Sequence, residues 1–107
     1  MIALTPEQRQ TIERRFRDLA TRWDELTLYR SNLSALRNHP VYQDLIGLSE
    51  AAIPLILREL ERKRSVSWIM PLADITGEDP IPAESAGHVT AMADAWLEWG
   101  RRRGFLG

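Results

Sequence analysis

The chain has 107 residues, of which 44% are apolar and 27% are charged, and its formal net charge is −1. This length and composition fit a globular domain, and the small net charge gives no overall field that would attract nucleic acid or an anionic membrane. The absence of cysteine excludes disulfides, thiolate nucleophiles and cysteine metal sites. The sequence shows neither a secretory-type N-terminal segment nor an apolar run of membrane-spanning length, so we expect a soluble cytoplasmic protein.

The first predicted element is a long amphipathic helix over residues 5–30. Thr5 is a good N-cap, Pro6 suits the first turn, and Gln8 completes a capping box. Apolar residues then recur at spacings of four and three, which is typical of one buried helical face. This apolar seam consists of Ile12, Phe16, Leu19, Trp23 and Leu26. Another element, or a second copy of the chain, must cover the seam.

The helical pattern then weakens, and His39-Pro40 starts a run of shorter helices over residues 40–77. We expect Ser49 to cap the second of these helices. Pro54 is then expected inside that helix, near its start, where it removes one backbone donor and bends the axis.

Gly77 is the expected C-cap of the last helix in this run. Residues 78–87 contain two prolines and are predicted to form a linker, and residues 88–103 are predicted to form the C-terminal helix. No segment alternates at a period of two residues. We therefore predict an all-α fold for residues 1–107, as a single domain with a compact bundle of about five or six helices.

The middle of the chain resembles HEAT-like α-solenoid repeats. The resemblance rests on a helix in which a proline follows an aliphatic residue, on a block that ends in glycine, and on two tryptophans three residues apart. These features lie at residues 48–60, at residues 72–77, and at Trp96 and Trp99. The resemblance covers about residues 40–100 and implies HEAT-like helix pairs. Because a solenoid needs about three repeats and only one and a half are present, we expect the long first helix to close the stack.

A closer resemblance, over residues 16–105, is to a family of small uncharacterised bacterial proteins with a HEAT-like helical core. It implies no activity, cofactor or site residue. Its landmarks are Phe16, Leu19, Trp23, His39-Pro40-Val41-Tyr42-Gln43, Ile53-Pro54-Leu55-Ile56-Leu57-Arg58-Glu59-Leu60, Trp68, Ile75-Thr76-Gly77-Glu78-Asp79-Pro80 and Ala95-Trp96-Leu97-Glu98-Trp99-Gly100.

The residues that could carry chemistry form no established motif. His39 and His88 are the two histidines, and their spacing from Glu78 and Asp79 matches no metal-ligand pattern. We expect His39 to cap a helix and the adjacent carboxylates to cap a helix or stay solvated. A small hydrolase that uses Glu78, Asp79 and a histidine is the weakest interpretation. We therefore expect no enzyme, no metal and no cofactor.

Thirteen of the fourteen basic residues are arginines, which make planar, bidentate contacts to carboxylates and phosphates. The basic clusters, together with the tryptophan that we expect to be partly exposed, form the candidate interaction surface. Its residues are Arg14, Arg17, Arg58, Arg62, Lys63, Arg64, Trp99, Arg101 and Arg102.

These residues favour a non-catalytic helical module that binds another protein. The specific hypothesis is an antitoxin or accessory subunit of a two-component bacterial operon, whose partner is encoded nearby. The alternative is a nucleic-acid-associated accessory protein that binds phosphates through its arginine clusters. Self-association is also left open.

Overall fold

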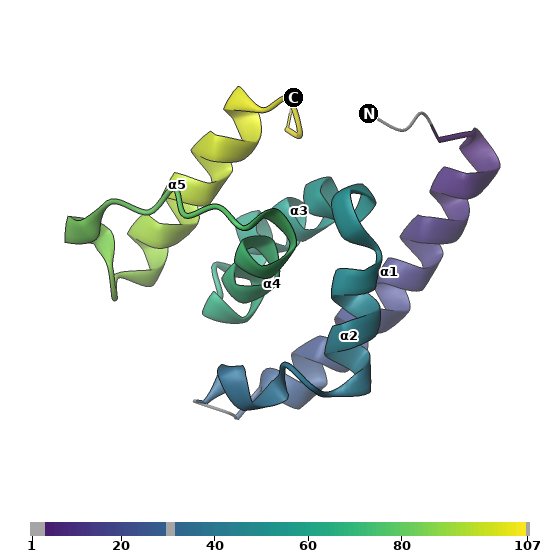
Figure 1. Cartoon of the computed structure of the whole chain (residues 1–107), viewed down its shortest axis with the longest axis horizontal. Helices are drawn as coiled ribbons and strands as arrows, with labels where there is room; N and C mark the ends of the chain where they lie inside the picture. The colour runs from purple at the N-terminus through teal and green to yellow at the C-terminus, as the bar shows by residue number, and fades with distance from the viewer. Residues whose placement is uncertain (1–3, 30–31, 107) are drawn as a thin grey trace. The chain divides into compact units, whose positions relative to one another are not determined.

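The computed structural model describes residues 4–29 and 32–106. Within them the chain forms five α-helices, three short 3₁₀ helices and no β-strand, so the predicted all-α class is confirmed. The helices fall into two units, residues 1–52 and residues 53–107 (Figure 1). None of the helices in the described residues combines the length and the apolar character that a membrane span requires.

The first unit begins with the long helix that the sequence predicts. Its elements are α1 (Pro6–Thr27), the 3₁₀ helix η1 (Leu33–Leu36), α2 (Pro40–Gly47) and the 3₁₀ helix η2 (Ser49–Ala52). The capping box of α1 is confirmed, because Thr5 N donates to Gln8 Oε1 at 2.9 Å and Gln8 N donates to Thr5 Oγ1 at 3.1 Å. The helix ends before the predicted limit at Arg30, which lies outside the described residues.

The apolar seam of α1 packs inside the first unit, where α2 lies against it. Phe16, Leu19 and Trp23 are buried, and the Trp23 ring meets the fully buried Tyr42 ring with centroids 4.9 Å apart. Because the unit itself covers the centre of the seam, the seam is not the face through which a second copy of the chain would bind.

The second unit is built around α3, which contacts both α4 and α5. Its elements are α3 (Ile53–Lys63), α4 (Val66–Thr76), the 3₁₀ helix η3 (Ala83–Ser85) and α5 (Val89–Arg102). Side chains from all three α-helices are fully buried in its core, among them Ile56, Leu57, Leu60, Trp68, Leu72, Trp96 and Leu97. Gly77 ends α4 as predicted, with a left-handed φ of 68° and its N–H donating to the carbonyl of Ala73 at 2.8 Å.

The start of α3 differs from the prediction. Ser49 does not cap α3; it opens η2 with a φ of 57°, and its hydroxyl donates to the carbonyl of Gly47 at 3.4 Å. Because α3 begins only at Ile53, Pro54 lies in its first turn, where the N–H that proline lacks has no intrahelical partner in any case. Pro54 therefore removes no intrahelical hydrogen bond, which was the expected cause of a bend in this helix. The HEAT-like pairing of helices and the single-domain organisation stay predictions.

Helix α5 approaches α3 closely at Gly100. A Cβ atom at this position would lie 2.6 Å from Leu57 Cδ1 and 3.4 Å from Leu106 Cδ1. The Leu57 side chain is fully buried and has little room to move in a close-packed core. A residue without a side chain is therefore required where the two helices meet.

We predict that Gly100→Ala lowers the free energy of unfolding by about 1–3 kcal/mol, the range typical of an overpacked core. Urea denaturation followed by tryptophan fluorescence would measure the change, because three of the four tryptophans lie in this unit. Gly47→Ala is the matched control, since no atom lies within 4 Å of a Cβ at that position. Unchanged stability of Gly100→Ala would contradict the close approach.

Candidate functional site

The nine residues of the candidate interaction surface are divided between the two units. Arg14 and Arg17 lie on α1, in the first unit, and both are exposed. The other seven lie in the second unit, where they occupy α3, the residue after it, and the C-terminal half of α5.

Carboxylates neutralise the basic residues at the end of α3. Arg62 Nη1 lies 2.7 Å from Glu59 Oε2, and Lys63 Nζ lies 2.8 Å from Glu59 Oε1. The Glu59 side chain is only 12% exposed, so both contacts are charge-assisted hydrogen bonds at a partly desolvated carboxylate. Arg64 Nη1 lies 2.5 Å from Asp94 Oδ1, which joins the end of α3 to α5.

The arginines at the end of α5 are paired in the same way. Glu98 lies 3.2 Å from Arg102 Nε and 3.8 Å from Arg101 Nη1, and Arg103 Nη2 lies 2.5 Å from Glu78 Oε1. Among the candidate cations of this unit, only Arg58 has no ion pair with a described residue. An incoming phosphate would therefore have to compete with a carboxylate at every other position.

Trp99 is buried, with 7% of its surface exposed, so the expected partial exposure is wrong. Its ring stacks on Phe105 with centroids 5.5 Å apart, and the Arg103 guanidinium carbon lies 5.3 Å from its ring centroid. Trp96 contacts it edge-on, with a centroid distance of 5.2 Å. Residues after α5 thus fold back over Trp99, and this side chain is not available to anchor a partner.

The histidine and the carboxylates considered for catalysis have local structural contacts. His39 Nδ1 accepts a hydrogen bond from Val41 N at 3.1 Å, which caps α2 as expected. Asp79 Oδ1 accepts from Ile81 N at 3.2 Å, while Glu78 forms the ion pair with Arg103. No group of three or more acidic or histidine side chains that could hold a metal ion occurs in residues 4–29 and 32–106.

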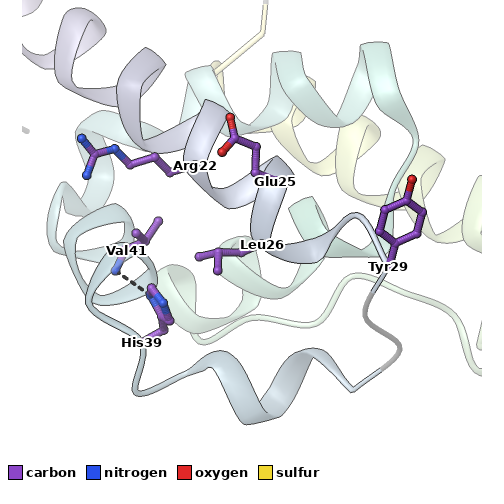
Figure 2. Close-up of a pocket in the computed structure, with 6 residues that line it drawn as sticks. All are labelled: Arg22, Glu25, Leu26, Tyr29, His39 and Val41. Atoms are coloured by element: carbon purple, nitrogen blue, oxygen red, sulfur yellow. Dashed lines mark hydrogen bonds between the residues drawn. The ribbon is translucent and has the colours of Figure 1, made fainter.

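An open hollow of about 550 Å³ lies in the first unit, beside the C-terminal half of α1 and the start of α2 (Figure 2). Leu26 and Val41 give it an apolar surface, as Figure 2 shows. The remaining lining residues are polar or aromatic, namely Arg22, Glu25, Tyr29 and His39. A volume of this size accommodates several side chains of a bound segment.

Two strongly exposed apolar side chains lie at the same end of α1. Tyr29 is 94% exposed and Leu28 is 67% exposed, the largest values among the large apolar side chains of the described residues. Neither residue was in the candidate surface, although helical periodicity indicates that Leu28 is exposed. At about 100° per residue, Leu28 lies about 140° around the axis from Trp23, away from the buried seam.

The chain matches no protein-family model, no curated protein and no solved structure. The resemblance to HEAT-like repeats and to a bacterial family therefore stays a prediction. The chemistry and geometry of the surface itself are therefore the basis on which function is inferred.

The contact of His39 with Val41 gives a test of its role. We predict that His39→Ala, which removes the cap acceptor, lowers the free energy of unfolding by about 1 kcal/mol, whereas His39→Asn keeps an acceptor and keeps the stability. Thermal denaturation followed by circular dichroism would measure both variants. If His39→Ala were as stable as the wild type, the side chain would not act as a cap.

Proposed function

We propose that this chain is a non-catalytic helical module that binds another protein through its first unit. The observation that carries the proposal is the exposure of Tyr29 and Leu28 beside the hollow at the end of α1. Apolar side chains gathered next to a concave surface with a polar rim are typical of protein contact sites. A tyrosine supplies a large contact area at low cost in conformational entropy and is enriched among the residues that dominate binding energy.

The hollow indicates the chemistry of the partner segment. Leu26 and Val41 suit an aliphatic side chain. A neutral His39 ring that accepts at Nδ1 carries its proton on Nε2, so it presents a donor, and Arg22 presents further donors. The partner segment is therefore one that places a carbonyl or carboxylate oxygen next to an aliphatic side chain.

The specific form of this proposal is an antitoxin or accessory subunit of a two-component bacterial operon, acting in the cytoplasm on a partner encoded nearby. Analogy with small bacterial operon products supports this form, and the exposed end of α1 supplies a surface through which such a subunit would contact its partner. Co-expression with the product of the neighbouring gene tests it directly.

We predict that the chain recovers one stoichiometric partner from its native host, and that Tyr29→Ala weakens the binding of the purified partner about tenfold, which corresponds to about 1.4 kcal/mol. Isothermal titration calorimetry would measure the affinity. Val89→Ala removes an exposed apolar side chain from α5 and should bind like the wild type. Recovery of no stoichiometric partner, or equal binding by Tyr29→Ala, would contradict the proposal.

The alternative of a nucleic-acid-associated protein requires salt-sensitive binding through the cluster of Arg62, Lys63 and Arg64. Because each of these cations already contacts a carboxylate, we expect no salt-sensitive oligonucleotide binding in a gel-shift assay. Binding that disappears when all three residues are neutralised would favour the alternative over the protein-binding function.

A further inference from the structure

The outer face of α1 carries a pattern that is complementary to itself. Five exposed residues on this face recur at spacings of three, four, four and three, and at about 100° per residue they fall within an arc of about 80°. We call them the outer stripe: Arg14, Arg17, Thr21, Glu25 and Leu28. The stripe lies opposite the buried seam residues Phe16, Leu19 and Trp23. Leu28 belongs to it because its backbone is still helical, with φ −54° and ψ −39°.

The two charged residues nearest the centre of the stripe have no partner in the part of the chain that the structure describes. The side chains of Arg17 and Glu25 make no hydrogen bond or ion pair there, although Arg22, between them, pairs with Asp18 at 3.3 Å. At the centre, the hydroxyl of Thr21 donates to the carbonyl of Arg17 at 3.0 Å, so it needs no further acceptor. The stripe thus has a small side chain at its centre. The two charged side chains that flank it have opposite signs, and neither forms an ion pair with a described residue.

We propose that the outer stripe pairs with the same stripe of a second copy of this chain. The two α1 helices run antiparallel, and a twofold axis passes beside Thr21. Arg17 and Glu25 lie four residues before and after Thr21, so this arrangement sets Arg17 of each copy opposite Glu25 of the other. A parallel arrangement in register would instead set like charges against each other, which is unfavourable.

The outer positions of the stripe fit the same arrangement. Arg14 and Leu28 lie seven residues before and after Thr21, so Arg14 of each copy lies opposite Leu28 of the other. The alkyl part of an arginine covers apolar surface while its guanidinium stays in water, and here it would cover the exposed Leu28. The small Thr21 allows the two helices to approach at the centre.

This inference concerns a different partner from the proposed function, although the two surfaces share part of α1. Glu25 of the stripe also lines the hollow, and the exposed Leu28 lies beside it, whereas the other residues that line the hollow do not belong to the stripe. A chain that stays monomeric and still binds its protein partner would remove the inference and leave the proposed function intact. The stripe is mostly polar, so the dimer is expected to be reversible, concentration-dependent and weakened by salt.

Charge exchange between the two central positions tests the arrangement. Sedimentation equilibrium of the full chain over a range of concentrations should show a reversible dimer. Arg17→Glu and Glu25→Arg should each weaken it by about tenfold, because either change sets two pairs of like charges against each other. The double variant should dimerise like the wild type, and an equimolar mixture of the two single variants should form a heterodimer.

Arg9→Glu is the matched control. It makes the same change of charge at an exposed position of α1 that lies about 120° around the axis from Thr21, so it should dimerise like the wild type. Circular dichroism of each variant checks that the helices are retained. A wild-type chain that is monomeric up to about 1 mM, or a double variant as weak as the single ones, would overturn the inference. The wild-type measurement decides the matter even if a variant fails to fold.

Discussion

The contact between Trp23 and Tyr42 determines which side of α1 meets solvent. Both side chains are fully buried, and their rings meet at a centroid distance of 4.9 Å. Once this contact fixes the rotation of α1 about its axis, the stripe centred on Thr21 must face outward. Leu26, three residues beyond Trp23, then reaches the edge of the seam, where the hollow opens. The exposure of the stripe and the position of Leu26 at the hollow therefore both follow from one aromatic contact.

The second unit shows why basic residues in a sequence do not define a basic surface. The arginines and the lysine at the ends of α3 and α5 form two consecutive runs in the chain. The fold brings carboxylates to them from the same helix, from a neighbouring helix and from the segment after α4. The Glu59 carboxylate holds two cations at once. These cations are thus neutralised by carboxylates of the same unit and are less available to a partner. Each exposed ion pair contributes at most about 1 kcal/mol to the stability of the unit.

Local features of the fold could be predicted from the sequence, and features that depend on distant residues could not. The capping box at Thr5 and the left-handed glycine at Gly77 involve residues within four positions of each other, so their chemistry is visible in the sequence. The burial of Trp99 depends on the chain turning back after α5, which brings Phe105 against it. The hollow depends on where the start of α2 lies against α1, and no periodicity contains that information.

Most helix contacts of each unit join elements that follow one another in the sequence. α2 packs on α1 and α4 packs on α3, whereas the contact of α3 with α5 closes a longer loop that contains α4 and η3. Helical folds that are rich in local contacts belong to the class that folds within microseconds to milliseconds. All residues that form the contacts of the first unit have been synthesised once residue 52 has been added. This part of the chain can therefore begin to bury Trp23 while the second unit is still being translated.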